Sequence, residues 1–176
     1  MTSKTFVVDT SIFQSAGLTK NPESSKSREI LEDILKICHK VIFTPYISSE
    51  WKKHRSRYSY TWLASMTARK KVIRRKDEQV FNKKLRDKIS FINLEPAFMD
   101  AIEKDIPFIE AAMSTDNLIV SKDDKIRNIL CNIIDNVPML KQISWMNPID
   151  VERDKIVDWL NDVDDAQKQK SLRKNI

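Results

Sequence analysis

Four carboxylates in this sequence stand beside short apolar runs and are the residues best suited to chemistry: Asp9, Glu50, Asp105 and Asp123. A single acid at such a place is usually a turn residue, a helix cap or an exposed side chain. Four acids gathered together raise one another's pKa and oppose folding unless a cation neutralises them. Because no histidine or cysteine cluster accompanies them, their oxygens favour a hard ion, Mg²⁺ or Mn²⁺, over Zn²⁺. Together they predict a catalytic metal site for phosphodiester hydrolysis.

Hydroxyl groups and one further acid accompany these carboxylates. Ser11 follows Asp9 by two positions, and Ser121 precedes Asp123 by two. We expect both serines to support the site by orienting carboxylates or water. Asp124 directly follows Asp123, so either acid fits the fourth position; the Ser-x-Asp spacing favours Asp123, with Asp124 in a supporting place.

The acids can meet only if the strands that precede them run in parallel. Buried strands are predicted at five apolar runs: 6–9, 41–45, 89–94, 118–123 and 143–147. Amphipathic stretches of helical length separate these runs, which predicts an α/β fold of three layers with a mostly parallel sheet between helices. Residues that follow different strands then converge on the carboxyl edge of the sheet. Asp105 is expected there as the N-cap of a helix that has Pro107 in its first turn.

The ordered set of motifs resembles the PIN-domain ribonucleases. The matching stretches are "VVDTSIF", "ISSEWKKH", "DIPFIEAAMSTDNLIVSKDD" and "ISWMNP". The resemblance covers residues 1–150, a PIN-like nuclease domain that includes an extra basic helical segment at 52–88. Residues 151–176 remain as an acidic C-terminal helix followed by a polar tail. The resemblance implies a central parallel sheet of about five strands in the order 3-2-1-4-5.

The activity that the resemblance implies is that of a Mg²⁺- or Mn²⁺-dependent endoribonuclease. Its substrate would be single-stranded RNA, with metal-bound water attacking phosphorus in line and leaving 5′-phosphate and 3′-hydroxyl ends. The four acids would be both the catalytic residues and the metal ligands. Toxin-type members of the family also imply an antitoxin-like protein partner and a homodimer.

A strongly basic segment supports a nucleic-acid substrate. Residues 52–88 hold fourteen Lys or Arg and three acids, a net charge of +11, whereas the whole chain carries +6 and the remainder therefore −5. Such an excess of one sign is expected to hold a phosphate backbone with little sequence preference. The residues expected to grip RNA are Lys52, Lys53, Arg55, Arg69, Lys70, Arg74 and Arg75.

Other function classes are excluded by composition. Gly17 is the only glycine, which rules out glycine-rich phosphate loops. The apolar run at the N-terminus is short and broken by Asp9, so it is not a signal peptide, and no run is long enough to span a membrane. Cys38 and Cys131 lie far apart within apolar patterns and are expected to be buried reduced thiols, which favours a cytoplasmic protein.

Two alternatives remain beside the nuclease. The first is a catalytically inactive PIN-like module that binds RNA or a protein without cleaving it; the presence of all four acids argues against it. The second is a phosphotransfer enzyme with Asp9 as nucleophile, as in haloacid-dehalogenase-like phosphatases. Such enzymes need a second acid two residues later, where this chain has Ser11.

Overall fold

One parallel sheet organises the computed structural model, which describes residues 3–161. Its strands are paired in the order β3-β2-β1-β4-β5, and every pair is parallel. This confirms the predicted fold class and strand order. The strands are β1 Thr5–Val8, β2 Lys40–Phe43, β3 Val72–Arg74, β4 Leu118–Val120 and β5 Ser144–Met146.

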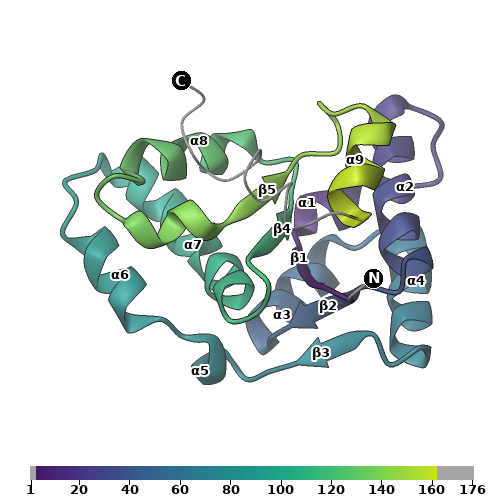
Figure 1. Ribbon diagram of the computed structural model, residues 1–176, viewed down its shortest axis with the longest axis horizontal. Helices are drawn as coiled ribbons and strands as arrows, with labels where there is room; N and C mark the ends of the chain where they lie inside the picture. Colours follow the sequence, from purple (N-terminus) through teal and green to yellow (C-terminus); the bar gives the residue numbers. More distant parts are fainter. Residues whose placement is uncertain (1–2, 162–176) are drawn as a thin grey trace.

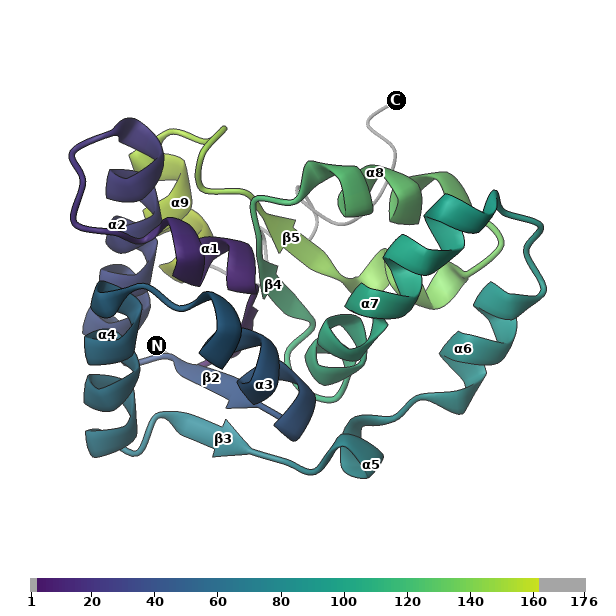
Figure 2. The same cartoon turned by 180° about the vertical axis from the view of Figure 1, so that it is seen from behind.

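Helices cover both faces of the sheet. Those on one face are α1, α2, α4 and α9, and those on the other are α7 and α8 (Figures 1 and 2). The first five helices are α1 Thr10–Ser15, α2 Pro22–Lys36, α3 Pro45–His54, α4 Arg57–Ala68 and α5 Asp77–Val80. The others are α6 Lys83–Ser90, α7 Pro96–Met113, α8 Asp124–Ile133, the 3₁₀ helix Pro138–Gln142 and α9 Arg153–Asn161.

Polar side chains fix the start of most long helices. In five helices the N-cap side chain accepts a hydrogen bond from the backbone N–H three residues later, which satisfies one of the donors that a helix start leaves unpaired. These N-caps are Asn21, Thr44, Ser56, Asn82 and Asp123. Thr44, the cap of α3, directly follows β2, and Asp123, the cap of α8, comes three residues after the end of β4. These two caps therefore fix where each helix starts at the carboxyl edge of the sheet.

Aromatic rings join the helices to the sheet. The ring of Phe13, on α1, contacts those of Phe43, Trp51 and Trp62, at 5.7 to 6.4 Å between centroids. On the central strand, the ring of Phe6 contacts Trp159 of α9 at 5.4 Å. Trp51 and Trp62 are buried and belong to the core. Within residues 3–161 no helix is both long and apolar enough to cross a membrane.

The prediction of a strand at 89–94 was wrong. Leu85 and Ile89 are buried one helical turn apart on α6, whose start is capped by Asn82, so this stretch begins as the end of a helix and continues as an irregular connection. The missing strand is β3, inside the segment expected to be helical. Lys70 ends α4 with φ 56°, in the left-handed region, and the chain then turns into a three-residue edge strand.

The predicted start of the helix at Asp105 was also wrong. Helix α7 begins at Pro96, which occupies the first helical position, and Pro107 lies inside the helix. Buried Ile102, Ile106 and Ile109 continue one apolar face through the proline. Asp105 is therefore held in the middle of a long helix rather than at a flexible helix start.

Two expectations about the rest of the chain need correction or limits. Cys38 is exposed and Cys131 is half-buried, so neither side chain is buried as expected. The acidic C-terminal helix is present as α9, which packs against α2 and is joined to it by ion pairs from Arg153 to Glu29 and Asp33, both at 3.0 Å. The polar tail predicted after it lies outside the described residues.

Candidate active site

Asp9 is fixed at the carboxyl end of the two central strands. Its N–H donates to the carbonyl of Val120 at 2.9 Å, which extends the pairing of β1 with β4 by one residue. Its Oδ2 accepts hydrogen bonds from the hydroxyls of Ser121, at 2.8 Å, and Ser11. Thr10 Oγ1 lies 3.3 Å from Oδ1. Both serines predicted to support the site therefore hold this carboxylate.

Asp105 lies opposite, on α7, and is the most strongly perturbed acid of the group. Burial, followed by the charges of Asp9 and Asp123, raises the pKa of Asp105 from its ordinary 3.8 to about 7; Glu50 adds to the rise and Lys104 opposes it. Asp9, Asp105 and Ser121 also line one small cavity of about 10 Å³, close to the space of one water. Asp9, Asp123 and Glu50 thus all lie close enough to Asp105 to raise its pKa.

Glu50 faces the site from α3, but its oxygens have partners on the same helix. Oε1 forms an ion pair with Lys53 at 2.5 Å, and Oε2 lies 3.8 Å from Nε2 of His54. One turn earlier, burial and the charges of Glu50 and Asp105 raise the pKa of the Tyr46 hydroxyl. Among the acids that act on Asp105, Glu50 has the smallest influence.

The two adjacent acids after β4 have different environments. Asp123 caps α8, with Oδ1 accepting from the N–H of Ile126 at 3.1 Å, and it acts on the pKa of Asp105. Asp124 instead accepts from the Asn147 amide at 2.8 Å, and the same amide donates to Asp150 at 2.7 Å. Burial is the largest cause that raises the pKa of Asp124. Asp123 therefore lies with the acid group, whereas Asp124 belongs to a separate polar cluster.

The carboxylate oxygens of the four acids are ligands that suit a hard divalent ion, but they are not arranged around one point. Within residues 3–161 no group of three or more Asp, Glu, His or Cys side chains is placed to hold a metal ion. The contacts explain why: Glu50 turns to Lys53 and His54, and Asp123 turns to the start of α8. An ion bound by all four acids would require Glu50 and Asp123 to give up these contacts. Carboxylates and hydroxyls remain ligands suited to Mg²⁺ or Mn²⁺.

The basic residues expected to grip RNA are divided by the sheet. Because β3 runs parallel to β2, Arg69 and Lys70 precede the strand at the amino edge, whereas Arg74 and Arg75 lie at the carboxyl edge beside the acids. Lys71 and Arg75 are four residues apart, about 13 Å along an extended strand. The segment therefore does not form a single basic patch.

The basic residues at the end of α3 have local partners in two cases. Arg55 packs against two aromatic rings, with its guanidinium 4.8 Å from the centroid of Trp51 and 4.9 Å from that of Tyr60. Lys53 is paired with Glu50, and Lys52 is exposed. Arg74 is exposed as well, while Arg75 donates to the carbonyl of Ser114 at 3.3 Å.

Sequence reasoning missed two residues that border the acids. Tyr46 packs its ring on Phe108 at 6.0 Å, and its hydroxyl donates to the carbonyl of Lys104 at 2.8 Å, which ties α3 to α7. The one available signal was its place four residues before Glu50, on the same side of a helix. Lys104, the charge that lowers the pKa of Asp105, gave no signal because a single exposed lysine is common.

Comparisons with known proteins gave no match: no family model matches this chain, and neither the curated proteins nor the solved structures searched contain a match. The resemblance to PIN-domain ribonucleases therefore stays a prediction, and a function for this chain has to be inferred from the geometry of the site.

Proposed function

We propose that this protein is a metal-dependent endoribonuclease of the PIN type, in which Asp9, Glu50, Asp105 and Asp123 form the catalytic site. One observation carries the proposal: Asp9, held by the hydroxyls of Ser11 and Ser121, lines the same small cavity as Asp105 at the carboxyl edge of the sheet. Burial and the neighbouring charges of Asp9 and Asp123 raise the pKa of Asp105 to about 7, in agreement with this arrangement. Structural carboxylates normally gain a cationic partner or hydrogen-bond donors when they are buried. Crowded acids at the carboxyl edge of a parallel sheet are typical of a functional site instead.

The resident ion in this proposal is Mg²⁺ or Mn²⁺, held by carboxylate oxygens. Such an ion lowers the pKa of a bound water and stabilises the charge that develops on a phosphate. Ser11 and Ser121 hold Asp9 in one orientation, so that its carboxylate needs little reorganisation. Asp105, with a pKa near neutrality, loses its proton as positive charge enters the site.

RNA is the proposed substrate because the positive charge of the chain is concentrated in residues 52–88. Arg74 and Arg75 follow or end β3 at the carboxyl edge of the sheet, as Asp9 does for β1, and the exposed Arg74 would bind the phosphate backbone there. These contacts are electrostatic, so binding should weaken steeply as salt rises. The preference for single strands follows the resemblance to the PIN family.

Cleavage of a fluorogenic single-stranded RNA in Mn²⁺ tests the proposal. We expect Asp9→Asn and Asp105→Asn to abolish cleavage, and EDTA to stop the wild-type reaction. Asp100→Asn is the matched control, because Asp100 is an exposed acid on the same helix as Asp105. An unchanged rate for Asp9→Asn would place any nuclease site elsewhere.

A second candidate is a PIN-like module that binds RNA without cleaving it. The pairing of Glu50 with Lys53 and His54 favours it, since these contacts occupy one of the four acids. Salt-dependent RNA binding with no cleavage in either Mg²⁺ or Mn²⁺ would support this candidate. The antitoxin-like partner, the homodimer and the cytoplasmic location are proposals of the same kind, which co-purification, size-exclusion chromatography and cell fractionation would test.

A further inference from the structure

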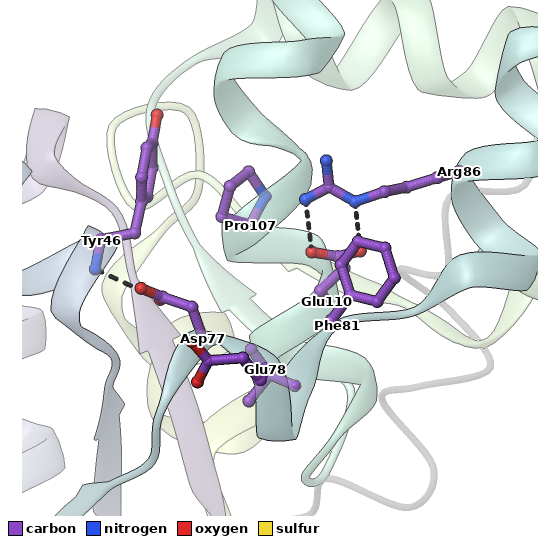
Figure 3. A pocket seen from close by; sticks show the side chains of 8 residues that line it. Tyr46, Asp77, Glu78, Phe81, Arg86, Pro107 and Glu110 are labelled. Atoms are coloured by element: carbon purple, nitrogen blue, oxygen red, sulfur yellow. Dashed lines mark hydrogen bonds and ion pairs between the residues drawn. The ribbon is translucent and has the colours of Figure 1, made fainter.

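A second cavity of about 350 Å³ lies beside the acids, between α3, α5, α6 and α7. Its walls are mainly apolar and come from Tyr46, Val80, Phe81 and Pro107 (Figure 3). Phe81 is 53% exposed, so its ring is accessible to a ligand. The volume falls at the lower end of the range of small-molecule sites, about 300 to 1,000 Å³.

One side of this cavity is a rigid polar framework. Glu110 is only 2% exposed and accepts two hydrogen bonds from Arg86, both at 2.8 Å, and one from the N–H of Asn82 at 2.9 Å. The guanidinium of Arg86 also lies 4.9 Å from the ring centroid of Phe81. These contacts hold a cation and an aromatic ring in fixed positions (Figure 3).

The opposite rim carries hydrogen-bond acceptors. Asp77 and Glu78 line the cavity, and Oδ1 of Asp77 accepts from the N–H of Tyr46 at 3.2 Å (Figure 3). This bond ties the start of α3 to α5. Ionised carboxylates accept hydrogen bonds but donate none, so this rim selects a ligand with N–H groups.

The cavity also borders the proposed catalytic site. Tyr46 lines the cavity, and its hydroxyl donates to the carbonyl of Lys104, the residue before Asp105. Pro107, which also lines the cavity, lies two residues after Asp105 on α7. A ligand in the cavity would therefore contact residues that directly neighbour Asp105.

We propose that this cavity binds one unpaired nucleobase of the RNA and that it favours guanine. The inference rests on the proposed ribonuclease activity and assigns that site a base preference. Phe81, with the Arg86 guanidinium beside it, offers a stacking surface of the kind that proteins use for single-stranded bases. Guanine presents two adjacent N–H donors on its Watson–Crick edge, which match the two oxygens of one carboxylate; the other bases present fewer donors side by side.

The charges near the cavity suit the rest of the strand. Arg75 and Lys76 immediately precede α5, and both follow β3 at the carboxyl edge. A base held at Phe81 would place the adjoining phosphates between these cations and the four acids. The cavity itself is lined by three carboxylates and a single cation, so it is poorly suited to a free phosphate.

Binding of the four ribonucleoside 5′-monophosphates, measured by calorimetry, tests the base site directly. We expect GMP to bind most tightly and inosine monophosphate, which lacks one N–H donor group, to bind more weakly. Phe81→Ala should weaken GMP binding by about 10-fold, since it removes the stacking surface. Phe91→Ala is the matched control, because Phe91 is 89% exposed and lies outside the cavity.

A second variant tests the acceptor rim. Asp77→Asn keeps one oxygen for the N–H of Tyr46 but replaces the other by an amide donor, so it should reduce the preference for GMP over the other nucleotides. If no nucleotide binds, or if Phe81→Ala binds GMP as the wild type does, the base site is refuted. A cavity that receives a protein side chain instead would give this negative result.

Cleavage mapping separates this inference from the proposed activity. On RNA with a single guanine among other bases, the wild type should cut at a fixed distance from the guanine. Phe81→Ala should still cut but lose that preference, and Phe91→Ala should keep it. GMP binding without any cleavage would leave the base site standing and refute the nuclease; cleavage with the same pattern in Phe81→Ala would do the reverse.

Discussion

Replacing Asp105 by Asn should stabilise the folded protein at pH 8 in the absence of divalent ions. In the folded chain the pKa of Asp105 is raised from 3.8 to about 7, mainly by burial and then by Asp9 and Asp123. A raised carboxyl pKa means that the folded state binds the proton more tightly than the unfolded chain does. The resulting stabilisation is fully present below about pH 4 and is lost as pH rises through about 7. Asn has no such proton to lose.

The expected size follows from the shift. About three pKa units at 1.36 kcal/mol each give about 4 kcal/mol, and screening of a half-buried group lowers this to about 2 to 4 kcal/mol. The free energy of unfolding of Asp105→Asn, compared with that of the wild type, should therefore rise by this amount between pH 4 and pH 8. All four tryptophans are buried, so their fluorescence in urea reports unfolding.

A control variant, Asp100→Asn, and added Mn²⁺ both test whether the charge of Asp105 is the cause. Asp100→Asn should show no such gain with pH, because this acid is exposed on the same helix. Added Mn²⁺ should stabilise the wild type at pH 8 and have little effect on Asp105→Asn, since binding to the folded state alone raises stability. A difference between Asp105→Asn and wild type that does not change with pH would refute the electrostatic reasoning.

Three further predictions concern the supporting residues. Ser121→Ala removes a donor to Asp9 and should lower the cleavage rate about 10-fold with little change in urea stability. Arg86→Met leaves Glu110 buried without its cation and should cost about 3 to 5 kcal/mol in urea unfolding, most of which the added Glu110→Leu should restore. Arg74→Gln should reduce the salt dependence of single-stranded RNA binding, by a slope of about 0.7, whereas Arg69→Gln at the other sheet edge should not.

Four of the five strands follow directly from the sequence. The runs that form β1, β2, β4 and β5 are continuous and apolar, as expected for strands buried on both faces. Edge strand β3 was missed because its three residues are flanked by five cations, which give no period of two. The run 89–94 looked equally apolar, but Asn82 and the spacing of Leu85 and Ile89 make its first part helical.

The sequence predicted those parts of the candidate site whose positions follow from the strand order. Asp9 and Asp123 follow adjacent parallel strands, so their approach needs only the strand order. Asp105 reaches the same place from the middle of α7, because the helix starts at Pro96, nine residues before Asp105, rather than directly after it. The turn of Glu50 toward Lys53 depends on side-chain rotamers, which a sequence pattern does not specify.

The base cavity had no signal in the sequence. Its lining comes from four helices, and the residues that matter are ordinary in isolation: a tyrosine after a proline, a helix-end phenylalanine and one arginine. Only the long connection from β3 to β4 brings α5, α6 and α7 together with the start of α3. Strand β3 itself divides the basic segment, because it runs from the amino edge of the sheet to the carboxyl edge.

The most direct measurement is anomalous diffraction from a crystal soaked in Mn²⁺ near neutral pH. The account predicts manganese density bound by oxygens of Asp9 and Asp105, with Glu50 and Asp123 turned from their present partners toward the ion. Absence of bound manganese at that edge, with the four carboxylates keeping the contacts to Ser11, Ser121, Lys53 and Ile126, would contradict it.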